Sequence, residues 1–353
     1  QKQLDCGMVE RASACEWASC PHIALKPYRG TSRDSDVFDI RVVGDYVQVN
    51  SQIQRLQPNG PDSASQIKHA AGHHAYWYTD GDQQYQGWGL HPDSRDVLAV
   101  WTPLGLLRPT RLQFGETNAG IVTQADVTTM LERDLDPESR SHIINGADDF
   151  TGFADHTYDA SGKPVIDYWG LAKSFIALIE MANKNNMSMK ASKTFFGSPD
   201  AEFWGHTLDK DGHRAAIYNL EPIRSMVAPS NVSELRRVLG LMVQHKDAIP
   251  SWAKDAKPLH VLTRKGEAWA WTRERDQCFE RLRAARLENS ILAAPDYSKP
   301  FCVGCDASDD GKGVQLYQLR DPSAPDVLSN RATIAYYSKC WSPSMARRPP
   351  YYK

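Results

Sequence analysis

The sequence has 353 residues, of which 41% are hydrophobic and 24% charged, so the chain is long enough to bury a core and to form two or three domains. Its 41 basic and 43 acidic residues give a net charge of -2, which argues against a protein that binds polyanions over its whole surface. No apolar run approaches the roughly 18 residues of a membrane-spanning helix, so we expect no membrane partner.

Seven cysteines are spread along the chain, an odd number that favours a reduced compartment in a chain of this size without a secretory leader. Cys302 and Cys305 form a C-x-x-C motif, but FCVGCD reads as a strand, in which residues three apart point to opposite faces. His73 and His74 lie beside aromatic residues and match no ligand spacing. We therefore expect no zinc site.

The first 70 residues are irregular, with strand-like pieces such as FDIRVV (38–43) between turn-rich stretches. AYWYTD (75–80) reads as a strand that ends in Asp80, and 120–132 reads as a helix. The expected buried side of this helix consists of Ile121, Ala125 and Thr128 or Thr129.

Asn145-Gly146 is a strong short-range turn signal, so IINGADDFTGF (143–153) is expected to form a hairpin. A long amphipathic helix is predicted at 168–183, followed by a second hairpin in TFFGSPDAEFWGHTL (194–208). The helix is expected to bury Leu171, Phe175, Leu178 and Ile179.

Residues 214–290 read mainly as helices. Asn231 and Glu234 have the spacing of a capping box, and a second helix is predicted after Thr272. The first helix carries an apolar stripe at Leu235, Val238, Leu239 and Met242. The second carries Arg273, Arg275, Arg281, Arg283 and Arg286. From 291 onward, alternating segments predict strands of a further sheet.

The near-neutral total charge hides two local imbalances. Residues 214–286 contain 14 basic against 8 acidic residues, a balance of +6, whereas 132–167 contain 3 against 9, a balance of -6. An acidic site facing a basic surface suits an enzyme that uses cations on a polyanion. The alternative is that these are ordinary solvated helix faces.

Three acidic residues have the positions expected of a metal site: Asp80 at a strand end, and the adjacent pair Asp148 and Asp149. Adjacent like charges repel, so folding alone gives no reason to place the pair together. Two divalent ions could stabilise both the attacking and the leaving oxygen of a phosphoryl or nucleotidyl transfer, and Mg²⁺ binds through a few carboxylates, water and phosphate. An acidic pair in a polar turn is common, so this pattern alone is weak.

A collinear series of motifs strengthens the interpretation. The series consists of LDCGMVERASACEWASCP (4–21), RVVGDYVQVN (41–50), DGDQQYQGWGLHPDSRDVLAVWTPLGLLRPTRLQFGETNA (80–119), NGADDFTGFADH (145–156), EFWGHTLDKDG (202–212), NVSELRRVLGL (231–241) and APDYSKPFCVGCDASDDGKG (294–313). In this order the chain resembles the reverse transcriptase and the start of the ribonuclease H of Gypsy-class long-terminal-repeat retrotransposons.

The resemblance implies a role for each matching residue. Asp80, Asp148 and Asp149 would be the catalytic metal ligands, and Asp306 the first metal-binding acid of ribonuclease H. The implied nucleotide-binding residues are Arg41, Tyr85, Phe114, Gly115 and Gln124, with Tyr85 blocking a ribose 2′-hydroxyl. The implied primer and template contacts are Phe203, Trp204, Gly205, His206, Arg236 and Arg237. Gly146, Val47, Gln113 and Gly120 depart from the family pattern without removing a metal ligand.

The implied fold is α+β, a right-hand polymerase with fingers and palm at 1–213, thumb and connection helices at 214–290, and a partial ribonuclease H-like domain at 291–353. The implied cofactor is Mg²⁺ or Mn²⁺. The implied partners are an RNA or DNA template-primer, dNTPs and other segments of a Pol polyprotein, in cytoplasmic virus-like particles or in the nucleus. Because only Asp306 of the ribonuclease H acids is present, we expect no cleavage of RNA in a hybrid.

A second hypothesis is a captured, degenerate copy that serves as a non-catalytic binding or structural subunit. The missing initial Met, the end at Lys353, the Gly146 change and the weak basicity favour it, whereas three intact metal positions favour the enzyme. A general nucleic-acid-binding protein fits less well, because the positive charge is confined to one segment.

Overall fold

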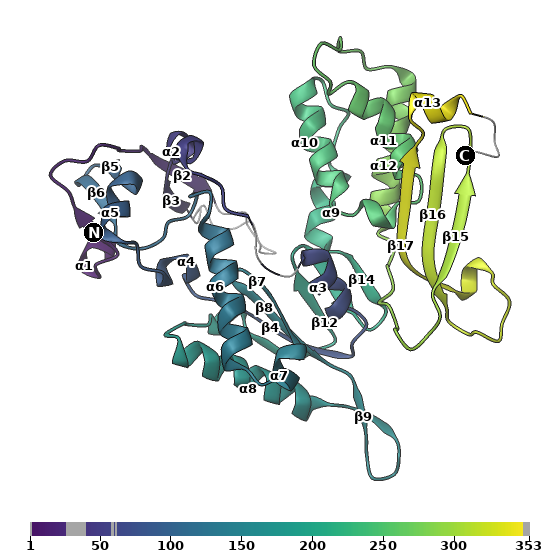
Figure 1. The fold of residues 1–353 in the computed structure, drawn as a ribbon, viewed down its shortest axis with the longest axis horizontal. Coiled ribbons are helices and arrows are strands. Elements are labelled where there is room, and N and C mark those ends of the chain that lie inside the picture. Colours follow the sequence, from purple (N-terminus) through teal and green to yellow (C-terminus); the bar gives the residue numbers. More distant parts are fainter. Residues whose placement is uncertain (1, 26–39, 58–59, 61, 349–353) are drawn as a thin grey trace. The chain divides into compact units, whose positions relative to one another are not determined.

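The computed structural model describes residues 2–25, 40–57, 60 and 62–348, and these form two compact units (Figure 1). Unit 1 comprises residues 1–62, 77–152 and 169–196, and unit 2 comprises 63–76, 153–168 and 197–353. Both units combine helices with antiparallel strand pairs, which confirms the predicted α+β class.

The main sheet of unit 1 has four strands in the order β11-β4-β8-β7. Their bounds are Phe195–Ser198 for β11, Ala75–Asp80 for β4, Asp149–Ala154 for β8 and Ile143–Gly146 for β7. Every residue of β7 and most of β8 is buried, because helices α6 (Ala119–Asp134) and α8 (Tyr168–Lys184) lie against the sheet. Trp77 of β4 is fully buried and donates its Nε1–H to Ser174 Oγ of α8 at 2.9 Å.

Two smaller sheets complete the strands of unit 1. They are β2 (Pro21–Leu25) with β3 (Ile40–Gly44), and β1 (Val9–Arg11), β6 (Gly105–Pro109) and β5 (Val100–Thr102) in the order β1-β6-β5. The short helices are α1 (Lys2–Asp5), α2 (Val47–Gln52), α4 (Gln84–Gly87), α5 (Pro92–Arg95) and α7 (Pro137–Ser141). The predicted strand FDIRVV is seen from Ile40, and its first two residues lie outside the described part.

Helix α6 buries a different side from the one predicted. Ile121 and Ala125 are only half-buried and Thr129 is exposed, so Thr128 alone of the predicted set is buried. The buried residues are Ala119, Thr123, Val127, Thr128 and Leu131. Alanine and threonine side chains share the inner face with Val127 and Leu131, and therefore apolar periodicity alone indicated the wrong side.

Helix α8 confirms the predicted helix, and Leu171 and Leu178 are buried as expected. Phe175 and Ile179 are half-buried, and the Phe175 ring contacts Trp77 with centroids 5.3 Å apart. Ser174 takes a fully interior position instead, where its hydroxyl accepts the hydrogen bond from the Trp77 indole. The polar residue was overlooked because its partner lies 97 positions away.

Unit 2 contains two three-stranded antiparallel sheets. The first consists of β12 (Asp200–Phe203), β13 (His206–Asp209) and β14 (Gly212–Ala215), and the second of β15 (Cys302–Ala307), β16 (Gly311–Leu319) and β17 (Arg331–Cys340). The hairpin predicted at 194–208 is therefore made by β12 and β13, whereas β11 belongs to the main sheet of unit 1. The second sheet confirms the strands predicted beyond residue 291.

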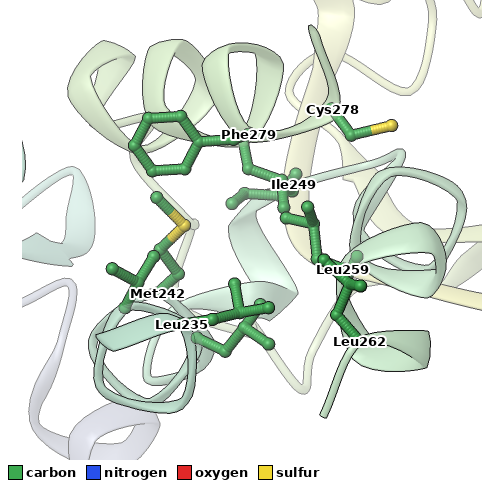
Figure 2. Close-up of a cluster of buried hydrophobic side chains, with 11 residues drawn as sticks. Leu235, Met242, Ile249, Leu259, Leu262, Cys278 and Phe279 are labelled. Atoms are coloured by element: carbon green, nitrogen blue, oxygen red, sulfur yellow. The ribbon is translucent and has the colours of Figure 1, made fainter. Parts of the chain in front are cut away.

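The long helices of unit 2 are α10 (Val232–Val243), α11 (Trp252–Val261) and α12 (Arg273–Glu288), which share one apolar core (Figure 2). The predicted stripe of α10 is buried throughout, and Asn231 Oδ1 accepts the Glu234 N–H at 3.0 Å. The Glu234 carboxylate accepts the backbone N–H of Ser230 at 2.8 Å, whereas a regular capping box would use the N–H of Asn231. The capping box is therefore shifted by one residue at this bond. Thr272 caps α12 as predicted.

The remaining elements of unit 2 are short. They are α3 (Ser63–Ala70), α9 (Ile217–Arg224), α13 (Pro343–Ala346), the pair β9 (His156–Tyr158) and β10 (Pro164–Ile166), and the short 3-10 helices η3 (Lys246–Ala248) and η4 (Leu328–Asn330). In the part of the chain that the structure describes, none of the helices combines the length and the apolar character that crossing a bilayer requires.

Candidate active site

The three predicted metal ligands lie together in unit 1. Asp80 ends β4, and the neighbouring strand β8 begins at Asp149, directly after Asp148. The Gly81 N–H donates to the Asp148 carbonyl oxygen at 2.7 Å, which ties the end of β4 to the β7–β8 hairpin. The side chains of Asp149 and Asp80 also interact, and this interaction raises the pKa of Asp149. Residues 68 positions apart in sequence thus share one end of the sheet.

The clustering of negative charge changes the chemistry of Asp149. Burial of its carboxyl group, followed by the charges of Asp148 and Asp80, raises the pKa of Asp149 to about 7. A cation placed among these side chains would favour their ionised forms.

The hairpin confirms the predicted strand pair but turns later than expected. Gly146 pairs with Asp149, so the two turn residues are Ala147 and Asp148, and Asn145 lies within β7 with its side chain buried. Ala147 has a φ of 54°, in the left-handed region that alanine rarely adopts. The prediction failed because the register of the main sheet overrides the local preference of Asn-Gly for a turn.

Gln124 of α6 holds this hairpin in place. Its Oε1 accepts the N–H of Ala147, and its Nε2 donates to Thr128 Oγ1 at 3.2 Å and to the Asn145 carbonyl oxygen at 3.4 Å. The predicted nucleotide-binding residue therefore supports the backbone beside the aspartates. These bonds hold Ala147 in its unusual conformation and so position Asp148.

Tyr85 lies beside the aspartates, on helix α4. Its ring packs against Phe114 with centroids 4.8 Å apart, and burial together with the charges of Asp148 and Asp149 raises the pKa of Tyr85. Gly115 follows Phe114 with a φ of 93°, and its carbonyl oxygen accepts from Asn50 Nδ2 at 2.8 Å. The structure thus brings Tyr85 and Phe114 together with the acidic group.

Lys193 is a site residue that sequence reasoning missed. Its ammonium group forms an ion pair with Asp80, 113 residues away, and its charge acts to lower the pKa of Asp149. The short helix η2 (Ala191–Lys193) carries it, and the Lys190 N–H donates to the Asp80 carbonyl oxygen at 2.8 Å. No spacing rule connects a lysine to an aspartate so distant in sequence.

The other predicted residues are placed less fully. Arg41 lies in β3 opposite Ala24, and its side chain is outside the described part. Phe203, Trp204, Gly205 and His206 form the β12–β13 turn in unit 2. Trp204 and Gly205 have φ values of 47° and 77°, as a two-residue hairpin turn requires. Trp204 is exposed and stacks on Phe203.

Three further predicted residues also lie in unit 2. Arg236 and Arg237 are exposed on α10, and Arg236 donates to the Thr263 carbonyl oxygen at 3.0 Å. Asp306 is exposed on the edge strand β15. Their roles in binding nucleic acid or metal stay predictions.

An all-carboxylate group of this kind matches the ligands that Mg²⁺ prefers. Within residues 2–25, 40–57, 60 and 62–348, however, no three His, Cys, Asp or Glu side chains already surround a common metal position. Asp80 instead contacts Lys193. The ligand chemistry fits a divalent cation, and the arrangement would need side-chain adjustment to hold one.

Comparison with known proteins identifies the chain's relatives. The RNase H-like domain found in reverse transcriptase matches residues 271–353. The retrovirus-related Pol polyprotein from transposon opus of Drosophila melanogaster is 28% identical over 263 residues, which cover 71% of this chain and 24% of that protein. The chain is related to retrotransposon Pol polyproteins. This confirms the resemblance seen in the motifs: the relatives are transposon Pol polyproteins, and residues 271–353 match an RNase H-like domain found in reverse transcriptase.

A second relative extends the match along the chain. The Tf2-3 polyprotein of Schizosaccharomyces pombe is 22% identical over 318 residues, covering 90% of this chain and 22% of that polyprotein. The chain therefore spans less than a quarter of the length of these relatives.

Solved structures show the same fold. A foamy viral protease-reverse transcriptase in complex with double-stranded DNA has a TM-score of 0.78 at 19% identity, covering 99% of this chain and 56% of that one. The foamy viral protease-reverse transcriptase in complex with an RNA/DNA hybrid has a TM-score of 0.73 at 19% identity, covering 99% and 43%. At these identities the likeness concerns the fold.

Proposed function

We propose that the chain is an RNA-directed DNA polymerase that extends a primer on an RNA or DNA template by nucleotidyl transfer. The observation that carries this proposal is the meeting of Asp80, Asp148 and Asp149 at one end of the main sheet, beside Tyr85 and Phe114. Residues 1–213 would supply fingers and palm, 214–290 the thumb and connection, and 291–353 a partial ribonuclease H-like domain.

The three aspartates would hold Mg²⁺ or Mn²⁺, which when bound lowers the pKa of a primer hydroxyl and neutralises phosphate charge. Asp149 would be deprotonated as ligand, so its proton must leave before the site is competent. Lys193 is the counter-ion of Asp80 in this structure, and it would have to release that carboxylate for Asp80 to hold a cation. The β7–β8 turn, supported by Gln124, keeps Asp148 in position.

The substrates would be bound by residues around this group. Tyr85, supported by Phe114, presents a ring that excludes a ribose 2′-hydroxyl by steric contact. Arg41 would orient the triphosphate, for which a guanidinium is well suited, and Gly115 would lie under the nucleotide. The primer and template would contact Phe203, Trp204, Gly205, His206, Arg236 and Arg237, in keeping with the DNA and RNA/DNA ligands of the foamy viral structures.

Ribonuclease H activity is not part of the proposal. Asp306 is exposed and can serve as one metal ligand, but a single acid does not form a two-metal site. Incubation of the purified chain with an RNA/DNA hybrid and Mg²⁺ or Mn²⁺ should leave the RNA intact.

A primer-extension assay on a homopolymer RNA template with Mg²⁺ or Mn²⁺ tests the proposal. The wild type should extend the primer, and Asp148→Asn should abolish extension while folding and template binding stay nearly intact. The matched control is Asp82→Asn, because Asp82 is exposed in the same unit and its carboxylate has no hydrogen-bond partner among the described residues. Full extension by Asp148→Asn would refute the assignment.

The Lys193–Asp80 ion pair favours a second candidate, a non-catalytic binding or structural subunit. A lysine that permanently neutralises Asp80 would stabilise the acidic group without any metal. This candidate predicts template binding by the wild type without extension under either metal. The same assay therefore separates the two functions.

A further inference from the structure

A cavity of about 130 Å³ in unit 2 is lined by basic groups from four parts of the fold. Helix α3 contributes Lys68, strands β13 and β14 contribute His206 and His213, His245 precedes η3, and α12 contributes Arg286. At about 30 Å³ for each water, the volume admits a small ion together with a few waters.

Arg286 is the most unusual of these groups. It is only 3% exposed, and within the described residues it forms no ion pair or hydrogen bond; its Nε–H has no acceptor. Guanidinium groups remain charged in proteins, and a buried charge without a partner is strongly unfavourable. Burial lowers the pKa of Arg286 to about 10, so the group is still cationic at neutral pH. An anion inside the cavity would supply the missing partner.

Three histidines add polar groups to the lining of the cavity. The ring centroid of His206 lies 4.2 Å from that of His245 and 5.4 Å from that of His213. His213 and His245 are 6% and 8% exposed, and His206 Nδ1 and His213 Nε2 have no hydrogen-bond partner in the described chain. An apolar core would be less costly at this position, which indicates that these nitrogens meet a ligand.

The charged residues that line the cavity are basic, with one exception. The titratable groups that face it are Lys68, His206, His213, Arg214, His245, Asp247 and Arg286. Arg214 is already paired with Asp209, and Asp247 is the one acidic residue in the lining. Lys68 and Arg286 therefore leave a net positive charge, which excludes a divalent cation and suits an oxyanion.

We propose that this cavity binds a phosphate group, with Arg286 as the principal cation and the rings of His206, His213 and His245 as neutral or protonated hydrogen-bond donors. The group could be inorganic phosphate or a phosphate of a nucleic-acid backbone, which offer the same oxygens. This site lies in unit 2 and is independent of the aspartates of unit 1.

The three histidine rings are uncharged at neutral pH. Burial and neighbouring positive charge lower the pKa of His206 to about 4, of His213 to about 3 and of His245 to about 2. The rings would therefore meet a phosphate group as neutral hydrogen-bond donors, while Arg286 and Lys68 supply the positive charge.

Nuclear magnetic resonance of ¹⁵N-histidine in the whole chain tests the site. Inorganic phosphate at pH 7.5 should shift the three ring signals saturably, whereas chloride at equal ionic strength should not. Arg286→Met should weaken phosphate binding at least about tenfold. Arg273→Met is the matched control on the same helix, because Arg273 is exposed, and should bind as the wild type does.

One outcome distinguishes inorganic phosphate from backbone phosphate, and others would overturn the proposal. Shifts caused by a DNA oligonucleotide without terminal phosphates, and not by inorganic phosphate, would assign the site to backbone phosphate. Unsaturable shifts with both ligands, or identical binding by folded Arg286→Met, would overturn the proposal. Circular dichroism checks folding. His245→Gln provides a second test and should weaken phosphate binding.

Discussion

Asp149 lies where three carboxylates meet, and burial beside Asp148 and Asp80 raises its pKa to about 7. The folded protein therefore binds this proton more tightly than the unfolded chain, whose carboxyl titrates near 3.8. The resulting stability is fully present below pH 3.8 and is lost as the pH rises through about 7. Denaturant unfolding of the metal-free protein should show this contribution falling between pH 4 and pH 8.

Two variants isolate this contribution from the rest of the titration. Asp149→Asn removes the titrating carboxyl group. The difference in unfolding free energy between the wild type and this variant should therefore fall with rising pH as described. Lys193→Met removes a charge that lowers the pKa of Asp149, and should therefore move the transition to higher pH. A pH-independent difference between wild type and Asp149→Asn would contradict the assigned shift.

Tyr85 allows a test of nucleotide choice. Its ring is supported by Phe114, so Tyr85→Ala should open space for a 2′-hydroxyl, whereas Tyr85→Phe keeps the ring and should discriminate as the wild type does. Relief of a steric clash of about 1–3 kcal/mol corresponds to a gain of roughly 5- to 150-fold in ribonucleotide incorporation. Single-nucleotide incorporation with paired ribo- and deoxynucleotides measures it. Unchanged selectivity in Tyr85→Ala would mean that Tyr85 serves only in packing and does not select the sugar.

At the scale of elements, the contact between β4 and β8 holds the aspartates together. A Cβ atom at Gly152 of β8 would lie 2.2–2.4 Å from the buried indole ring of Trp77. Gly152→Ala should therefore lower the unfolding free energy by about 1–3 kcal/mol through overpacking.

Gly87 provides the control for this substitution, because a Cβ there meets nothing within 4 Å. Gly87→Ala should change the unfolding free energy by less than about 0.5 kcal/mol. Urea unfolding compares the two variants. Equal stabilities would mean that Trp77 can move aside, and that the β4–β8 contact is looser than described.

Local signals predicted some elements well and failed where long-range packing decides. Asn231 and Thr272 marked the starts of α10 and α12, because a cap depends on residues three positions apart. The inner face of α6 and the turn at Ala147–Asp148 were missed, because both are determined by the neighbouring sheet. Lys193 and the Ser174–Trp77 hydrogen bond connect residues about 100 positions apart, and no sequence pattern indicates them.

At the scale of the molecule, the order of the motifs carried more information than any one of them. Asp80, Asp148 and Asp149 were a weak candidate metal site by their positions alone, and the order of the motifs strengthened that interpretation. The structure places them at one end of a sheet. The local balance of +6 did not distinguish exposed from buried arginines: Arg273 is exposed, whereas Arg286 of the same helix lies against a cavity. Charge counts cannot separate a solvated face from an internal anion site.

Mn²⁺ binding by the metal-free chain, measured by electron paramagnetic resonance, tests the central claim most directly. The wild type and Asp82→Asn should bind a Mn²⁺ ion that Asp148→Asn binds at least about tenfold more weakly, a difference of about 1.4 kcal/mol or more. Equal binding by the wild type and Asp148→Asn would contradict the claim that the three aspartates form a divalent-cation site.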